Sequence, residues 1–298
     1  MKLEPRFRNR DREFWANVRS ISERFGYTQK RVKQIKVPSL SDVIATLNSL
    51  DLDARHIYNT TTKSPTPTGM ALLDYFSYRA DVLNNYVEPR LMDVTRAAAT
   101  FARMRSEYNS MLSVPMNKQK NDKRAPAYLT GIVNTLIEGN CEGIVCNYSP
   151  SVLTTFTKGR APLRTLARRV DGCFPGTINP VAVWEIKEYY YTTTFGSRVA
   201  DGVYESLLDG LELEELREHE GVDCQHILIV DAYLTWWSMG RSYLCRMIDM
   251  LHMGYVDEVL FGYEVVECLP GIVKNWVELY HRRMDDHSPQ VQQGIRGV

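Results

Sequence analysis

The chain has 298 residues, of which 44% are hydrophobic, and its 36 basic and 36 acidic side chains cancel. This length and composition predict a globular protein with enough apolar residues for a sizeable core. The balanced charge excludes a strongly acidic or strongly basic chain. No apolar run approaches the ~18 to 20 residues that a membrane span needs.

The first 120 residues are predicted to be a mostly helical, basic region. Apolar residues recurring at three-to-four spacing predict four helices, over residues 11–25, 39–50, 70–84 and 87–111. Residues 1–36 hold 11 basic against 4 acidic side chains. These charges are either solvated helix faces or a surface that faces a phosphate backbone. The polar stretch "PMNKQKNDKRAP" then predicts a domain boundary near residue 120, which divides the chain into regions 1–120 and 121–298.

Strands and helices are mixed in the second region. The pattern predicts helices over 128–138, 198–218, 241–252 and 274–283, and strands over 143–147, 152–157, 168–174, 181–191, 226–234 and 258–263. Such an order predicts an α/β fold in which helices cover a mixed sheet. The last residues, "DDHSPQVQQGIRGV", are predicted to be a frayed tail.

The strand predicted over 181–191 carries two charges in an apolar and aromatic run. Alternation places Glu185 and Lys187 on one face and Trp184 on the other. Because an isolated buried charge is costly, this pair must be solvated, neutralised or placed over a charged ligand. Asp171 is a candidate partner, since it ends the preceding predicted strand and the turn-forming "PGTINP" would fold the two strands into a hairpin. Two carboxylates brought together suit a hard divalent cation such as Mg²⁺, which takes oxygen ligands. The lysine could then hold or help deprotonate a metal-bound water and neutralise charge in the transition state.

These residues resemble the signature of the PD-(D/E)XK nuclease superfamily. That signature is an acid at a strand end, a spacer of about ten to thirty residues, and then acid-x-Lys on the next strand. Here "VDG" and "EIK" leave 13 residues between Asp171 and Glu185, although Val170 stands where the family's name has proline. The tripeptide alone is a weak signal. Its context is more specific, because only Lys187 among the lysines has an acid two positions before it.

The resemblance implies a fold and a set of site residues. The fold is a restriction-endonuclease-like αβββαβ core, which the elements predicted from residue 128 onward match in order. Asp171 and Glu185 would be the metal ligands for Mg²⁺, and Lys187 would position the attacking water. Some members add a glutamate from the first core helix, for which Glu138 is the candidate, and others one from the helix after the third strand, for which Glu205 is the candidate.

Four further residues are candidates for DNA contacts. Ser197 and Arg198 stand near the start of a predicted helix, where they could bind a phosphate or simply cap and pack. Arg168 and Arg169 lead into Asp171 and could follow a duplex backbone or be exposed charges on a hairpin. The six cysteines show no zinc-site spacing and are expected to be reduced thiols of a soluble cytoplasmic protein. The chain has no phosphate-binding loop and no dinucleotide fingerprint, so no nucleotide cofactor is expected.

By this resemblance, the chain is expected to be a Mg²⁺-dependent endodeoxyribonuclease that hydrolyses phosphodiester bonds in double-stranded DNA. A type II restriction enzyme acting as a homodimer at a palindromic site is the specific expectation. Two alternatives stay open. One is a non-catalytic DNA-binding protein in which the charged strand is structural, and the other is a phage, repair or structure-specific nuclease with the same core.

Overall fold

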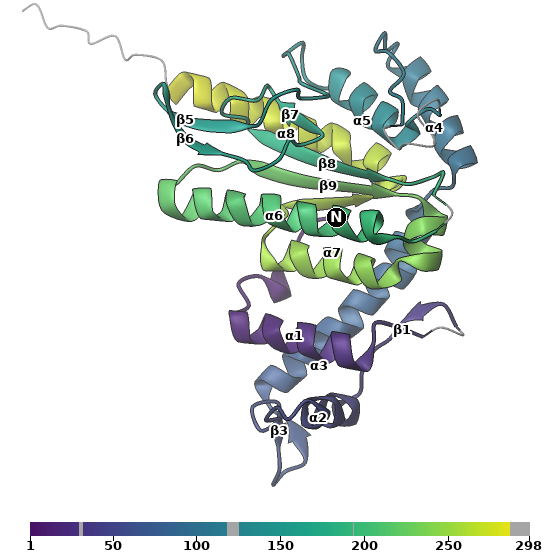
Figure 1. Cartoon of the computed structure of the whole chain (residues 1–298), viewed down its shortest axis with the longest axis vertical. Helices are drawn as coiled ribbons and strands as arrows, with labels where there is room; N and C mark the ends of the chain where they lie inside the picture. Colours follow the sequence, from purple (N-terminus) through teal and green to yellow (C-terminus); the bar gives the residue numbers. More distant parts are fainter. Residues whose placement is uncertain (30–31, 118–124, 193, 287–298) are drawn as a thin grey trace, which may run out of the picture.

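The structure is a computed structural model that describes residues 1–29, 32–117, 125–192 and 194–286. A four-stranded sheet forms its centre (Figure 1). Helices α4, α5 and α8 cover one face of this sheet, whereas α6 and α7 cover the other (Figure 1). The N-terminal helices α1, α2 and α3 pack beyond α7, on the side away from the sheet (Figure 1). The bounds of these helices are α1 Arg12–Phe25, α2 Leu40–Ser49, α3 Pro67–Asp81, α4 Val94–Glu107, α5 Tyr128–Glu138, α6 Ser197–Glu220, α7 Arg241–Met253 and α8 Glu264–Asp286.

The central sheet has the order β10-β9-β8-β7. Its strands are β7 Gly172–Phe174, β8 Ala182–Glu188, β9 Gln225–Asp231 and β10 Glu258–Phe261. Strand β8 runs antiparallel to β7 and parallel to β9, and β9 runs parallel to β10. The sheet is therefore mixed, and the carboxyl ends of its three parallel strands meet at one edge. In open α/β sheets this is the edge at which ligands bind.

Two hydrophobic clusters hold the sheet between its helical layers. Trp184 and Ile229 point toward α5 and α8, where Trp184 stacks on Trp276 at 5.6 Å between ring centroids. Leu228 and Val230 point the other way, into the cluster that includes α7. This division follows from the two-residue period of a strand, because successive side chains enter opposite faces.

The N-terminal helices have a core of their own, with Phe14, Val18 and Tyr75 among its buried residues. A buried ion pair connects this core to α7. Arg79 on α3 donates to Asp249 on α7 at 2.9 Å, and their side chains are 2% and 6% exposed. The pair is one of several contacts between the N-terminal region and α7, which include the hydrogen bond from Tyr75 to Asp249 and the ion pair of Glu23 with Arg246.

Short elements complete the structure. Residues 82–87 and 234–239 form π-helical turns, and residues 5–7 and 88–90 form 3₁₀ turns. Among the described residues, three two-stranded ribbons lie outside the central sheet: β1 Thr28–Gln29 with β2 Gln34–Ile35, β3 Tyr58–Asn59 with β4 Ser64–Pro65, and β5 Thr155–Lys158 with β6 Ala161–Thr165.

The predicted mixed sheet covered by helices, with a helical N-terminal region, is confirmed. Several bounds differ from the prediction. The strand predicted over 143–147 is reduced to a single bridge between Asn147 and Cys173, and the strand predicted over 168–174 begins only at Gly172. Helix α8 begins at Glu264, ten residues before the predicted start, because apolar residues such as Val265 and Leu269 are buried against the sheet.

The boundary predicted near residue 120 lies in 118–124, outside the described residues, and stays a prediction, as does the frayed tail beyond residue 286. Helix α4 precedes that boundary but packs on α5 in the cluster beside the sheet, as the close approach of Phe101 to Gly131 shows. None of the described helices combines the length and the apolar character that crossing a membrane requires.

Candidate active site

The pairing of β7 with β8 positions the three predicted catalytic residues. Gly172 pairs with Trp184, so Asp171, one residue before β7, lies across from Glu185. A Cβ atom on Gly172 would lie 2.1 Å from the indole ring of Trp184. Glycine is therefore needed for this register, which brings Asp171 beside the "EIK" segment. The structure corrects one detail, since Asp171 precedes its strand rather than ending it.

Strand β8 extends beyond its partner β7 and leaves an edge open. Only residues 182–184 of β8 pair with β7, while residues 185–188 continue along β9 alone. At the first part of this edge, the Oδ2 atom of Asp171 accepts a hydrogen bond from the backbone N–H of Ile186 at 2.9 Å. The carboxylate thus replaces a missing ladder partner, and its own position is fixed by the strand.

Glu185 and Lys187 form a buried ion pair on the face that α6 covers. The Lys187 Nζ atom lies 2.7 Å from Glu185 Oε2, and the two side chains are 5% and 0% exposed. The Glu185 Oε1 atom accepts from the backbone N–H of Asp171 at 3.2 Å. The Arg168 guanidinium contacts both oxygens of Glu185, at 2.9 and 3.2 Å. Glu185 therefore has charged or polar partners on both oxygens.

Helix α6 adds two carboxylates to this cluster. Glu205 lies 3.3 Å from Lys187 Nζ and 3.4 Å from the Arg168 guanidinium. Asp209, one helical turn later and fully buried, lies 2.5 Å from Arg168. Gly202 favours this close approach of the helix, since a Cβ there would lie 2.9 Å from the Tyr189 hydroxyl and 3.3 Å from Lys187 Cδ.

The cluster is negative overall, with four carboxylates against two cations. Although burial opposes it, the charges of Glu185 and Asp171 raise the pKa of Lys187 above its ordinary value. Burial, and then the charge of Glu185, raises the pKa of Asp209 to about 7. The pKa of Glu185 is lowered despite burial, because Lys187 and Arg168 stabilise its charged form. Lys187 is thus a fixed cation near neutral pH, suited to stabilising negative charge rather than to removing a proton.

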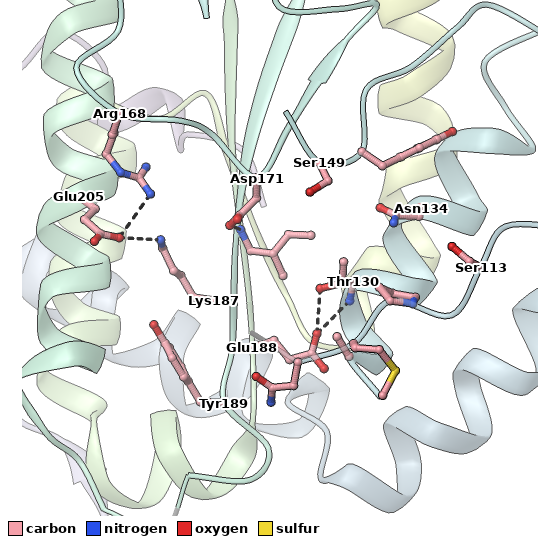
Figure 2. A pocket seen from close by; sticks show the side chains of 16 residues that line it. Ser113, Thr130, Asn134, Ser149, Arg168, Asp171, Lys187, Glu188, Tyr189 and Glu205 are labelled. Atoms are coloured by element: carbon pink, nitrogen blue, oxygen red, sulfur yellow. Dashed lines mark hydrogen bonds and ion pairs between the residues drawn. The ribbon is translucent and has the colours of Figure 1, made fainter. Parts of the chain in front are cut away.

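A pocket of about 530 Å³ opens beside this cluster. Figure 2 shows Asp171 near its middle, with Arg168, Lys187 and Glu205 on the α6 side. The opposite side carries both polar and apolar side chains, with Glu188 as its charged residue, and is formed by α5 and the loops around it (Figure 2). The residues that line it there are Ser113, Pro115, Met116, Asn117, Ala127, Thr130, Asn134, Tyr148 and Ser149. Neither Asn134 nor Thr130 was singled out from the sequence, where helix α5 shows only its apolar pattern.

Glu188 holds the two sides of the pocket together. Its carboxylate accepts from the backbone N–H and the hydroxyl of Thr130, each at 3.0 Å, at the first turn of α5. Helix α5 has Ala127 at its N-cap and no capping hydrogen bond from that side chain, so the neighbouring strand supplies the acceptor. Burial raises the pKa of Glu188 to about 7.

Of the remaining predicted residues whose side chains the structure describes, Arg168 contacts Glu185, whereas Glu138, Arg169 and Ser197 are not among the residues that line the pocket. Glu138, at the end of α5, accepts a hydrogen bond from Ser110 and is not among the residues that line the pocket. Arg168 is engaged by the carboxylate cluster instead of lying along an exposed surface. Arg169 is exposed, and Ser197 is the exposed first residue of α6. The side chain of Arg198 lies outside the described part of the chain.

The donor set can be compared with the needs of a hard divalent cation. Asp171, Glu185 and Glu205 offer carboxylate oxygens, which fit Mg²⁺ in type. As arranged, however, Arg168 and Lys187 contact both Glu185 and Glu205. Among the described residues, no three His, Cys, Asp or Glu side chains are grouped closely enough to hold a metal ion. A cation shared by Glu185 and Glu205 therefore requires Arg168 to move away from them.

The family of the chain follows from its match to known domain models. Residues 92–276, which contain the sheet and the whole cluster, match the model described as "Domain of unknown function (DUF7687)". The chain belongs to the DUF7687 family. Residues 1–86, ahead of the DUF7687 domain, match a second model, "Domain of unknown function (DUF7690)". No curated protein and no solved structure matches the chain.

Proposed function

We propose that this DUF7687 protein is a metal-dependent nuclease that hydrolyses phosphodiester bonds in double-stranded DNA. One observation carries the proposal: Asp171 contacts Glu185, Glu185 pairs with Lys187, and Asp171 and Lys187 line the pocket. The order of α5, the Asn147 bridge, β7, β8, α6 and β9 also supports the resemblance to the αβββαβ nuclease core, with the β5–β6 ribbon inserted between the bridge and β7 outside the central sheet.

The side chains divide the work of such a reaction. Lys187, a permanent cation at the pocket, would orient the attacking water and stabilise the negative charge that builds on the phosphate in the transition state. As arranged, Arg168 contacts Glu185. It would leave Glu185 when a cation binds and would then add positive charge on the same side of the pocket. Asp171, Glu185 and Glu205 are the residues that would hold Mg²⁺, which would supply a water of lowered pKa.

The resemblance extends the proposal to a type II restriction enzyme that acts as a homodimer in the cytoplasm. Two-fold symmetry in the protein would match two-fold symmetry in its DNA site. Ser197 and Arg169, both exposed, are the described candidates for backbone contacts outside the pocket.

A second candidate is a non-catalytic DNA-binding protein, and one observation favours it. Both oxygens of Glu185 already have partners in Arg168, Lys187 and the Asp171 N–H, which is what a structural ion cluster requires. In that case the cluster stabilises the fold, and DNA binding needs no metal.

A cleavage assay separates the two candidates. Supercoiled plasmid and phage DNA incubated with the purified chain and Mg²⁺ should give discrete products, and EDTA should abolish them. Lys187→Ala should bind DNA without cutting it, whereas Lys158→Ala, which removes an exposed lysine of β5, should cut like the wild type. DNA left intact by the wild type, together with tight binding in EDTA, would favour the binding protein.

A further inference from the structure

The α5 side of the pocket has the character of a binding site that the proposed cleavage chemistry does not use. Thr130 and Asn134 lie one turn apart on α5 and both line the pocket (Figure 2). The hydroxyl of Thr130 is engaged by Glu188. Asn134 is different, because its Oδ1 atom has no hydrogen-bond partner among the described residues, although the residue is only 8% exposed.

An amide oxygen without a partner in such a place is costly. A buried acceptor without a partner has lost its hydrogen bonds to water and gained none in return, and native proteins keep such groups rare. An asparagine side chain offers one acceptor and two donor hydrogens in a plane. That pattern is complementary to the edge of a nucleobase, to which asparagine can form two hydrogen bonds.

The surfaces around Asn134 suit the flat faces of a base. Tyr148 presents an aromatic ring at the pocket, and Met116 and Ile186 add apolar surface. Aromatic and apolar side chains on which a base stacks are the usual platform for an unpaired nucleotide. The volume of about 530 Å³ lies within the range of pockets that hold small organic ligands.

We propose that Asn134, with Tyr148 and Met116, forms a subsite for a nucleobase drawn out of the helical stack beside the scissile phosphate. The inference rests on the proposed function for its placement, since Lys187 and Asp171 line the same pocket from the other side. The phosphate would then lie on the Lys187 side and the base on the α5 side. Access requires local unstacking, which is costly in a duplex and costs least where the strand is already unpaired.

Small ligands test the subsite without any cleavage. Isothermal titration calorimetry in EDTA would compare the four 2′-deoxynucleoside 5′-monophosphates with 2-deoxyribose 5-phosphate. The wild type should bind at least one nucleotide about tenfold more tightly than the sugar phosphate, the value of a good base contact. Asn134→Ala should reduce that preference to less than about twofold, while Asn275→Ala, an exposed asparagine on α8, should keep it.

A second measurement guards against misfolding. Asn134→Leu removes the unsatisfied amide, so its melting temperature should equal or exceed that of the wild type. A lower melting temperature would indicate a structural asparagine and would overturn the inference. So would equal affinities for nucleotide and sugar phosphate, no binding of either, or a preference that survives in Asn134→Ala. If the protein prefers nucleotides but cuts no DNA, the nuclease proposal is refuted and the subsite stands. If it cuts DNA but shows no such preference, the subsite is refuted and the nuclease proposal stands.

Discussion

Asp231, at the carboxyl end of β9, should make the stability of the protein fall as pH rises. Its side chain is fully buried and accepts hydrogen bonds from the backbone N–H of Met92 at 2.7 Å and from the Tyr190 hydroxyl at 2.5 Å. Burial raises its pKa from 3.8 to about 7. The next residue, Ala232, has a φ of 126°, a conformation that costs free energy in a residue other than glycine. The substitution Asp231→Asn keeps the shape of the side chain and one hydrogen-bond acceptor. We expect it to remove the part of the fall in stability with rising pH that Asp231 causes.

The sign and size follow from proton linkage. Below about pH 4, Asp231 is protonated in both the folded and the unfolded chain. Between about pH 4 and pH 7 only the folded chain retains the proton, so its free energy of unfolding falls as pH rises. With pKa values of 3.8 and about 7, the fall from pH 5 to pH 7 is about 2 kcal/mol. Above pH 7 both states are ionised and the fall levels off.

Urea titrations followed by tryptophan fluorescence, between about pH 5 and pH 8, would measure the effect. Glu188 and Asp209 also have raised pKa values, so the informative quantity is the difference between wild type and Asp231→Asn at each pH. That difference should change by about 2 kcal/mol from pH 5 to pH 7. Asp223→Asn, at a carboxylate with 76% side-chain exposure, controls for the loss of one charge. A constant difference would mean that Asp231 is already ionised in the folded chain, contrary to the argument from burial.

Three further predictions concern the ion pair, the strand register and the cluster. Arg79→Met leaves the buried carboxylate of Asp249 without its cation. The free energy of unfolding, measured in urea, should therefore fall by about 3 to 5 kcal/mol. A loss below about 1 kcal/mol would contradict this expectation. Gly172→Ala forces a methyl group against Trp184 and should lower stability by about 1 to 3 kcal/mol in the same assay, whereas an unchanged value would show that the register tolerates a side chain. Arg168→Ala removes a cation that contacts three carboxylates, so Mg²⁺ should raise its melting temperature more than that of the wild type; equal shifts would count against a cation site.

The periodicity of the sequence determined much of the second region, because a helix or a strand shows its pattern in neighbouring residues. Helix α5 has the predicted bounds, Tyr128–Glu138. Alternation alone placed Glu185 and Lys187 on the face opposite Trp184, and the structure agrees. The same local pattern gave no warning that 143–147 would make only one bridge, since pairing depends on what lies alongside.

Which residues come together in the candidate site depended on the tertiary structure. The indole ring of Trp184 packs against Gly172, and this contact fixes the strand register that places Asp171 across from Glu185. The sequence of neither strand alone determines that register. One signal within reach of the sequence was the spacing of Asp209, four residues after Glu205 and so on the same face of α6. This face of α6 meets Arg168 and Lys187 only because the helix packs closely against strand β8 in the tertiary structure.

The unsatisfied amide of Asn134 and the capping of α5 by Glu188 were likewise invisible in the sequence. In the sequence, Asn134 is one of several polar residues in a mostly apolar helix, and Glu188 is a further charged residue directly after the "EIK" segment. Their roles come from burial, which removes water as a partner and makes each polar group depend on the atoms that the fold brings near it. Periodicity can be read along a chain, but burial and pairing arise only when distant segments pack together.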